Sequence, residues 1–351
     1  MSDNRLKNFP FIKTVLMMTV ILHHSIAFWK KDWFVFPPKI SSVFLTDFGI
    51  FLSTFHVQTF TMISGYLFAY KMFSRKGIYS EFSSFFKSKA KRLLVPLLFI
   101  SLFWSGPIGY LFFRWDRSTI FHNYILCEGP DQLWFILMLF DVFIIAWFLW
   151  DRVKDNCFIG WAFVLFLSVL GKIGISYLPN YYQIWIACQY LFFFYIGIRI
   201  RQKEEKGNKT IVSSVPSYIW ALFHICLFVI SRQNAFDEMI LKLFGGMIYK
   251  LYEMGVGLLL PVIGSVSAFT VLNDLADKAN WNNDSFIRLY SYSMPMYLFN
   301  QQICYFVIYW LGGMNPYLHA LIIFIITFIG SYAISAFFMK FKLTRFLIGE
   351  K

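Results

Sequence analysis

One feature recurs along almost the whole chain: apolar segments long enough to cross a membrane as helices. Crossing about 30 Å of hydrocarbon takes roughly 20 helical residues. Hydrophobic residues make up 58% of the chain and charged residues only 15%, whereas soluble domains carry about 25% charged residues. The predicted segments span ten ranges: 11–29, 45–70, 93–113, 132–150, 157–178, 183–198, 214–231, 241–272, 288–310 and 318–338. We therefore predict an all-α polytopic membrane bundle of about ten transmembrane helices.

The chemistry of the backbone favours the same fold. A backbone N–H or C=O that faces lipid without an internal partner costs several kcal/mol, and a helix satisfies these groups within one segment. A membrane β-barrel would instead show short strands of alternating hydrophobicity. No range has the composition of a separate soluble domain. Residues 1–351 are therefore predicted to form a single membrane domain in the cell (inner or plasma) membrane, in contact with its lipids.

Lysine and arginine are distributed unevenly among the loops. The richest stretches are residues 87–92 and 199–209, and they fall on the same side of the membrane if the N-terminus is inside. Because cytoplasmic loops carry an excess of these residues, both termini are predicted to be cytoplasmic. The formal net charge of +13 mostly reflects this bias. It is not interleaved with aromatic residues as a base-stacking surface, so no nucleic-acid partner is predicted.

The cysteines indicate neither a disulfide framework nor a metal site. They are odd in number, scattered, and contain no C-x-x-C motif. The five are Cys127, Cys157, Cys188, Cys226 and Cys304.

The first apolar segment has a lysine at one end and two adjacent histidines at the other, in the stretch KTVLMMTVILHHS from Lys13. On a helix that turns 100° per residue, His24 lies about 20° from the face of Lys13 and roughly 16 Å further along, whereas His23 lies about 80° away. One face would thus connect the cytoplasmic surface to the outer half of the membrane. An anchoring lysine and an interfacial histidine would give the same pattern, so the pair alone leaves both interpretations open.

Two further stretches carry polar residues at informative positions. FHVQTFTMISGYLF places His56 inside an apolar segment and contains Ser64–Gly65, where the missing glycine side chain allows another helix or a ligand to approach closely. KSKAKRLLVP, residues 87–96, concentrates cations just before a new helix. Such a cluster either anchors the helix at the membrane surface or binds the phosphates of an anionic cofactor.

Together these motifs resemble the integral-membrane acyltransferase family 3, whose members move acyl groups, usually acetyl, onto sugars outside the cytoplasm. In that family the first helix carries a basic residue, ten intervening positions and a histidine, and this spacing matches Lys13 and His24. The second-helix motif is similar to FHVQTF followed by SGY. The family's basic motif before the third helix matches Lys89, Arg92 and Pro96.

Three more fragments extend the resemblance to about residue 310. QLWFILMLF from Gln132, FFFYIGIRIR from Phe192 and SMPMYLFNQQ from Ser293 are similar to family segments in the same order. The chain departs from the family where Gln132 and Asn300 replace histidines and where Lys13 replaces the commoner arginine. An amide cannot titrate, so Asn300 is assigned no proton transfer but can hydrogen-bond a substrate.

The resemblance implies transfer of an acyl group from a thioester to a sugar hydroxyl. This reaction needs a base, a stabiliser for the developing oxyanion and a donor site. His24 is the expected base, because an imidazole takes and returns a proton near neutral pH. His56 either assists it or is a buried, hydrogen-bonded residue. Acetyl-CoA is the expected donor, held at the cytoplasmic face by Lys13, Lys89 and Arg92. No tightly bound cofactor and no metal are predicted.

The acceptor implied by the resemblance is an extracytoplasmic polysaccharide or its lipid-linked precursor. Ser64, Trp134 and Asn300 are predicted to contact the substrates, although Trp134 also fits an interfacial aromatic belt. The acceptor pocket has no sequence signature, so a soluble small-molecule acceptor and the oligomeric state stay open.

Other polar residues in apolar segments are assigned more simply. Asp141 and Glu253 would be costly facing lipid, so we expect both to face the interior of the bundle. There they either pair with a cation such as Lys250 or serve catalysis. Three histidines lack a motif and are expected to be structural: His122, His224 and His319.

Two other classes of protein compete with the enzyme. A transporter of a glycan or lipid-linked sugar would also use about ten helices and buried polar groups, but should show internal repeats or paired broken helices. No motif is duplicated between the halves of the sequence. A sensor or scaffold would need a soluble signalling domain or an interaction tail, and the segments flanking the predicted helices are short.

Overall fold

The computed structural model describes residues 2–30, 38–74, 76–154, 157–279, 281–311 and 313–350. Within these ranges the regular elements are all helical, with no strand, which confirms the predicted all-α bundle. The principal helices are α1 (Ser2–Lys30), α2 (Val43–Ser53), α3 (His56–Ser74), α8 (Trp134–Val153), α9 (Cys157–Tyr177), α10 (Ile184–Glu205), α12 (Ser217–Ser231), α13 (Asn234–Lys278), α14 (Asp284–Trp310) and α15 (Pro316–Phe338).

Shorter helices complete the bundle. Three α-helices form one span that runs from Phe82 to Phe112: α4 (Phe82–Lys89), α5 (Val95–Ile100) and α6 (Gly106–Phe112). Two π turns join them: η2 (Ala90–Leu94) and η3 (Ser101–Ser105). The others lie in connections or near the C-terminus: η1 (Gly77–Tyr79), α7 (Arg117–Ile120), η4 (Phe121–Ile125), η5 (Asp131–Leu133), η6 (Tyr181–Gln183), α11 (Ile211–Ser214) and α16 (Lys342–Leu347).

Each predicted segment coincides with helix, but not all are uninterrupted spans. Among the described residues, seven helices are long and apolar enough to cross a membrane, and α12 with residues 236–243 forms a bent eighth candidate. The segment 45–70 is broken between Ser53 and His56 into α2 and α3. The segment 288–310 lies within α14, where consecutive amides at 300–302 reduce the apolar character. The figure of ten crossings therefore stays a prediction.

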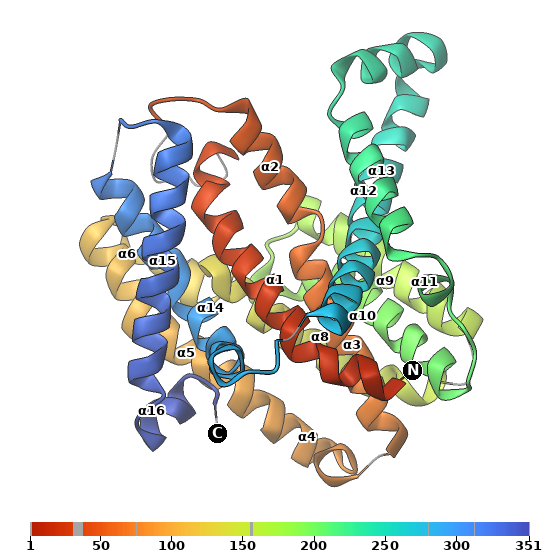
Figure 1. Cartoon of the computed structure of the whole chain (residues 1–351), viewed down its shortest axis with the longest axis horizontal. Helices are drawn as coiled ribbons and strands as arrows, with labels where there is room; N and C mark the ends of the chain where they lie inside the picture. The colour runs from red at the N-terminus through yellow and green to blue at the C-terminus, as the bar shows by residue number, and fades with distance from the viewer. Residues whose placement is uncertain are drawn as a thin grey trace.

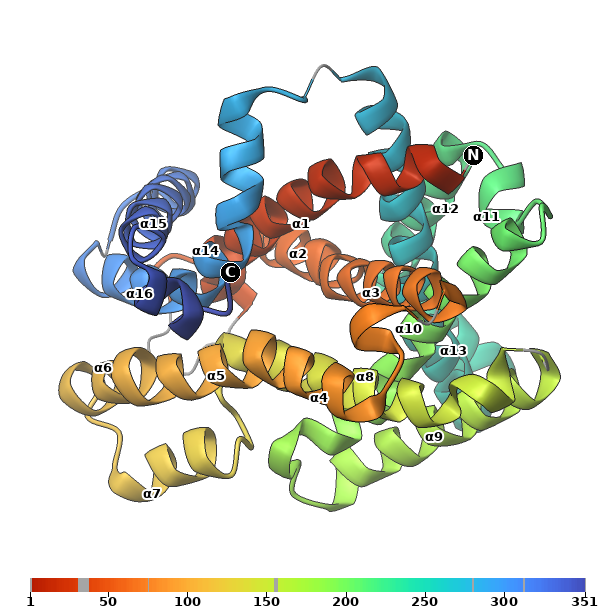
Figure 2. The same ribbon diagram turned by 90° about the horizontal axis from the view of Figure 1, so that it is seen from below.

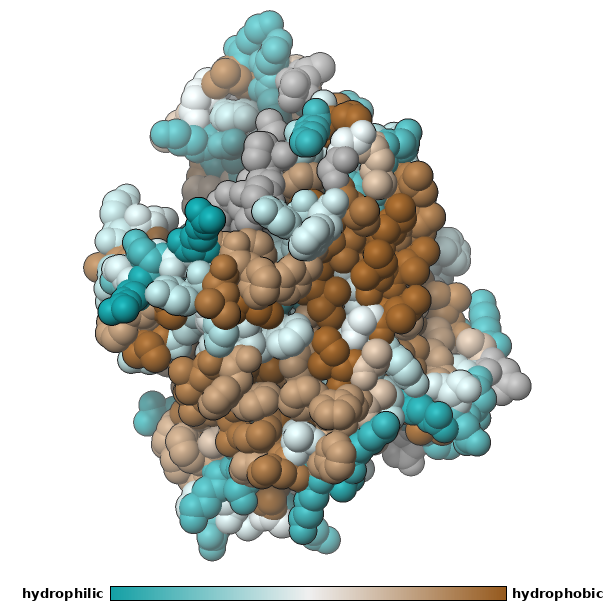
Figure 3. Space-filling view, turned by 90° about the vertical axis from the view of Figure 1, so that its left-hand side faces the viewer, coloured by the Kyte–Doolittle hydropathy of each residue, from teal (hydrophilic) through white to brown (hydrophobic). Residues whose placement is uncertain are grey.

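On the side of the molecule drawn in Figure 3, the surface is apolar between two more polar ends. Figure 3 shows apolar side chains across the middle of one side of the molecule and hydrophilic ones gathered toward its top and bottom. Helix α15 and the helices α5 and α6 lie on this side in Figure 1. The exposed apolar residues of these elements include Leu321 and Ile329 of α15, and Leu102 and Phe103 of the α4–α6 span. Such a band is what contact with a bilayer requires. Both termini lie toward the lower end of the bundle in Figure 1, and the assignment of that end to the cytoplasm stays a prediction.

Helices α3 and α10 approach each other closely through two glycines. A Cβ atom added at Gly65 would lie 1.9 Å from the carbonyl oxygen of Phe194, and one added at Gly197 would lie 1.9 Å from the carbonyl oxygen of Met62. Both backbones therefore pass within contact distance, as small residues allow in membrane bundles. Of the two explanations predicted for Gly65, the neighbouring helix is the one observed.

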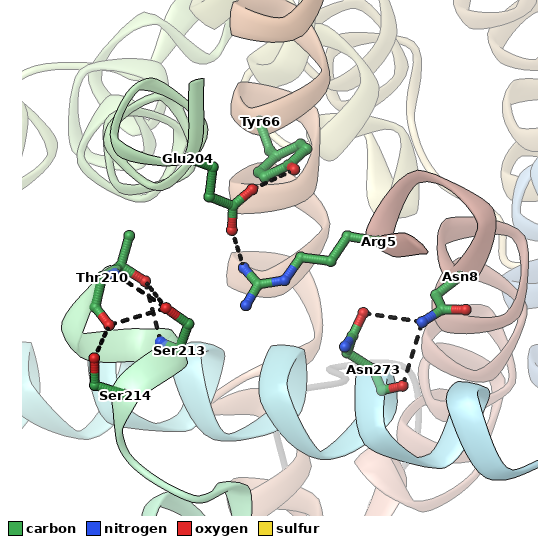
Figure 4. A network of polar contacts seen from close by, with 8 residues as sticks. All are labelled: Arg5, Asn8, Tyr66, Glu204, Thr210, Ser213, Ser214 and Asn273. Carbon is green, nitrogen blue, oxygen red and sulfur yellow. Dashed lines mark hydrogen bonds and ion pairs between the residues drawn. The ribbon is translucent and has the colours of Figure 1, made fainter. Parts of the chain in front are cut away.

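Polar contacts hold the first part of α1 against α10 and α13, and join α10 to α3 (Figure 4). Arg5 forms an ion pair with Glu204 of α10, which also accepts a hydrogen bond of 2.6 Å from the Tyr66 hydroxyl of α3. The Asn8 amide nitrogen donates to the Asn273 side-chain oxygen of α13 at 3.2 Å. These contacts position α1, the helix that carries Lys13 and His24.

Candidate functional site

Three histidine rings lie together near the end of α1 that is away from the N-terminus. The ring centroids of His23 and His56 are 4.8 Å apart, and those of His23 and His24 are 5.8 Å apart. The structure thus brings the two predicted catalytic residues, His24 and His56, into one cluster through His23. Among the described residues, no group of three or more His, Cys, Asp or Glu side chains has a geometry that could hold a metal ion, and this includes the three histidines.

The side chain of Asn300 determines which ring nitrogen of His24 carries hydrogen. Its amide nitrogen donates to the carbonyl oxygens of Tyr297 at 2.8 Å and Met296 at 3.3 Å. Carbonyls only accept, so the amide oxygen must face His24, whose Nδ1 lies 2.5 Å away. This network assigns the hydrogen to Nδ1. A neutral His24 then has its proton-accepting nitrogen at Nε2.

His56 has the same tautomer for a similar reason. Its Nδ1 lies 2.7 Å from the carbonyl oxygen of Leu52, so Nδ1 donates and Nε2 is the proton acceptor. The ring is buried at the first residue of α3, directly after the break that separates this helix from α2. The last turn of α2, directly before the break in the predicted segment 45–70, therefore provides the carbonyl that orients His56.

A cavity of about 490 Å³ lies among α1, α3, α8, α14 and the part of the Phe82–Phe112 span where α4 meets η2. The predicted donor-binding residues Lys13, Lys89 and Arg92 all line it, and so does the predicted substrate contact Ser64. Lys71, at the end of α3, adds a fourth cation. Most of the remaining lining is apolar or aromatic. The structure therefore places a group of cations and a largely apolar wall in one cavity.

The cavity extends to within one helical turn of the histidine cluster. Val20, four residues before His24 on α1, lines it, and so does Phe60, four residues after His56 on α3. Four residues correspond to roughly 6 Å along a helix. A molecule bound by the cations at one end can therefore present its other end beneath the histidines.

A π turn carries Arg92 and directly follows Lys89. Pro96 has no N–H to donate to the carbonyl four residues earlier, and the N–H of Val95 instead bonds to the carbonyl of Ala90, which widens the turn. The proline that contributes to the family resemblance thus shapes the backbone beside this cavity.

Aromatic rings surround Lys89. Its Nζ lies 3.6 Å from the ring centroid of Phe143 and 5.6 Å from that of Tyr79. Cation–π contacts of this kind stabilise a charge that has left bulk water. Burial raises the pKa of Tyr79 to about 12, although the positive charge of Arg92 lowers it. Tyr79 is therefore a neutral phenol at physiological pH.

Glu350 is an unpredicted component of the cavity wall. Burial raises the pKa of its carboxyl, and the positive charge of Arg92 lowers it. The preceding Gly349 has φ +78°, and a Cβ there would lie 2.5 Å from the carbonyl oxygen of Arg92. The end of the chain is thus packed against the π turn. No local motif marks this contact, because its two sides lie far apart in the sequence.

Three predicted residues lie elsewhere. Trp134 is not among the described residues that line this cavity, and packs edge-on against Tyr190 with ring centroids 5.6 Å apart. Asp141 is partly buried in α8, as expected, and its Oδ2 has no hydrogen-bond partner among the described residues. Glu253 is exposed, so its predicted interior position is wrong. The reason is visible in Figure 1, where this part of α13 stands beside α12 and away from the rest of the bundle.

Comparison with known proteins gives one family. The model of a family described as an acyltransferase domain matches residues 7–336. Similar curated proteins are glucans biosynthesis protein C of Escherichia coli strain K12 and that of E. coli O6:K15:H31 strain 536. Each is 24% identical over 151 residues, which covers 40% of this chain and 38% of the relative. The alignment thus spans well under half the length of these relatives. No solved structure matches the chain. Because the family match covers nearly all of the chain, the protein belongs to the membrane acyltransferase family 3.

Proposed function

We propose that this protein transfers an acetyl group from cytoplasmic acetyl-CoA to a hydroxyl of an extracytoplasmic polysaccharide or its lipid-linked precursor. The observation that carries the proposal is the arrangement along α1: Lys13 in a cationic cavity, then His24 one turn beyond the end of that cavity. The name of the glucans biosynthesis relatives supports a glycan as the acceptor.

The cavity suits a donor that is anionic at one end and reactive at the other. The phosphates of acetyl-CoA would bind the cations at Lys13, Lys71, Lys89 and Arg92. The pantetheine arm would follow the largely apolar wall past Val20, so that the thioester lies near His24. The acceptor, which does not share the chemistry of the donor, would then approach the histidines from the opposite side of the membrane.

His24 would act as the general base. Its Nε2 takes the proton of the acceptor hydroxyl while the hydroxyl oxygen attacks the thioester carbonyl. The tetrahedral intermediate then expels the CoA sulfur, which takes up the proton from Nε2, and the new ester leaves on the sugar. Asn300 holds His24 in the reactive tautomer and accepts from Nδ1–H when the ring is positively charged. His56 and His23 complete the polar cluster around it.

The direct test is acetyl transfer by the purified full chain in lipid nanodiscs. Radiolabelled acetyl-CoA is supplied with a panel of surface-glycan oligosaccharides, and ester-linked label on the sugar is the expected product. Binding of acetyl-CoA is measured in parallel. If acetyl-CoA neither binds nor donates its label to any acceptor, the proposal is wrong, and transport of a glycan across a vesicle membrane becomes the function to measure.

Replacing Arg92 with glutamine should weaken donor capture. Loss of one charge-assisted contact to phosphate costs about 1.5–3 kcal/mol, so the KM for acetyl-CoA should rise roughly 10- to 150-fold with little change in kcat. Lys91→Gln is the matched control, because Lys91 is an exposed cation on the same π turn but does not line the cavity. Equal effects of the two substitutions would show that only the general surface charge matters.

Replacing Asn300 with leucine should slow the chemical step without affecting donor binding. The substitution keeps the size of the side chain and removes the acceptor for His24 Nδ1–H. Losing this buried hydrogen bond costs about 1–3 kcal/mol, or roughly 5- to 150-fold in kcat. Gln301→Leu is the control, because the adjacent buried amide contacts Tyr305 instead of His24. A wild-type kcat for Asn300→Leu would remove Asn300 from the mechanism.

A further inference from the structure

A second cavity lies beyond the histidine cluster, on the side away from the donor cavity. It has a volume of about 410 Å³ and lies among the ends of α1 and α14 and the start of α15. Phe28 and Trp29 of α1 line it, four and five residues after His24, which is roughly 6–7.5 Å along the helix. Along α1 the order is therefore donor cavity, histidines, second cavity. The two cavities are placed to supply two substrates to one reactive centre.

The lining combines aromatic rings with a buried imidazole. Trp29, Tyr309 and Trp310 contribute aromatic surface, and the side chain of Trp310 is 76% exposed. His319 of α15 is only 4% exposed and lies edge-on to Trp29, with ring centroids 5.5 Å apart. Its Nε2 is buried and has no hydrogen-bond partner among the described residues.

An unpartnered buried nitrogen in a cavity wall indicates a missing ligand group. Buried polar atoms are nearly always hydrogen-bonded, since leaving one unpaired costs about 1–3 kcal/mol. An interfacial aromatic belt would account for an exposed Trp310, but not for the unpaired nitrogen of His319. A ligand that satisfies both features has an apolar face to lie on the aromatic rings and hydroxyl groups at its edge.

We propose that the second cavity is the acceptor subsite and binds a saccharide unit. The C–H face of a sugar ring would pack on Trp310 or Trp29, and a hydroxyl would hydrogen-bond to His319 Nε2. A neighbouring hydroxyl of the same or the next unit would then reach His24. This inference rests on the proposed function and adds to it the site of the acceptor. His319, expected from the sequence to be structural, becomes a substrate-binding residue.

Binding of short gluco-oligosaccharides to the full chain in nanodiscs tests this site, with ligand-observed NMR as the readout. Trp310→Leu and His319→Phe should each raise the Kd of the oligosaccharide about tenfold. His319→Gln should restore most of the affinity, because an amide can still hydrogen-bond. Tyr177→Leu is the control, since Tyr177 is an exposed aromatic residue at the end of α9 that does not line the cavity. The Kd of acetyl-CoA should be unchanged in every variant.

The outcomes separate this inference from the proposed function. A wild-type protein that does not bind the oligosaccharide, or variants that bind it as tightly as wild type, would overturn the acceptor subsite even if acetyl-CoA binds. Conversely, an oligosaccharide that binds wild type and is lost in Trp310→Leu and His319→Phe upholds the subsite. If acetyl-CoA then fails to bind wild type, the acetyl-transfer proposal fails and the saccharide site stands.

Discussion

Replacing His24 with alanine is expected to lower the kcat of acetyl transfer by roughly 10²–10⁴-fold, the usual contribution of a general base. The substitution removes the Nε2 atom that would take the hydroxyl proton, and it removes the ring nitrogen that donates to the amide oxygen of Asn300. Donor affinity should be retained, because His24 does not line the cavity that holds Lys13, Lys89 and Arg92. The predicted signature is therefore a large loss of turnover with an unchanged Kd for acetyl-CoA.

The measurement is the initial rate of label transfer in nanodiscs, together with the thermal unfolding temperature of each variant. His23→Ala is the closest control, because it removes an imidazole from the same cluster without touching the contact to Asn300. It should keep more activity than His24→Ala. Wild-type transfer by His24→Ala would contradict the assignment of the base, whereas a lowered unfolding temperature would indicate that lost structure had caused the loss of rate.

Helix positions were largely predictable from the sequence, because a bilayer allows few ways to satisfy the backbone. The segments 132–150 and 157–178 agree closely with α8 and α9. The break before His56 was not predicted, since 45–70 is apolar on both sides of it and contains no proline. Glu253 was misplaced for a different reason: hydropathy identifies a helix but not how much of it other helices cover.

Parts of the candidate site were also predictable. Lys13 and His24 lie on one helix, so their alignment follows from helical geometry alone. His23 was not predicted as part of the site, because on α1 it is rotated about 80° from the face of Lys13. The sequence does not indicate that α3 packs on the side of α1 that carries His23 and brings His56 next to it. Glu350 and Lys71 reach the cavity through long-range packing. The adjacent histidines in the sequence were the one available signal for the larger cluster.

Replacing Gly197 with alanine is expected to destabilise the protein strongly, because the added methyl group has no room between α10 and α3. The new Cβ would lie 1.9 Å from the carbonyl oxygen of Met62 and 2.8 Å from the backbone nitrogen of Tyr66. Both neighbours are backbone atoms of a helix, so no side chain can rotate away. Helices α3 and α10 must separate, at a cost of about 1–3 kcal/mol or more.

Gly255→Ala provides a matched control on α13, because a Cβ at that helical position meets nothing within 4 Å. Alanine reduces the conformational entropy of the unfolded chain relative to glycine. The free energy of unfolding of Gly255→Ala should therefore be unchanged or higher by about 0.4–1 kcal/mol. Thermal unfolding in the same lipid measures both. Separation of α3 from α10 would also move His56 and Ser64, which α3 carries, so Gly197→Ala should lose acetyl transfer below its unfolding temperature as well. Equal stability of the two variants would show that α3 and α10 do not pack this closely in the membrane, and that the position of His56 beside His23 must be set by other contacts.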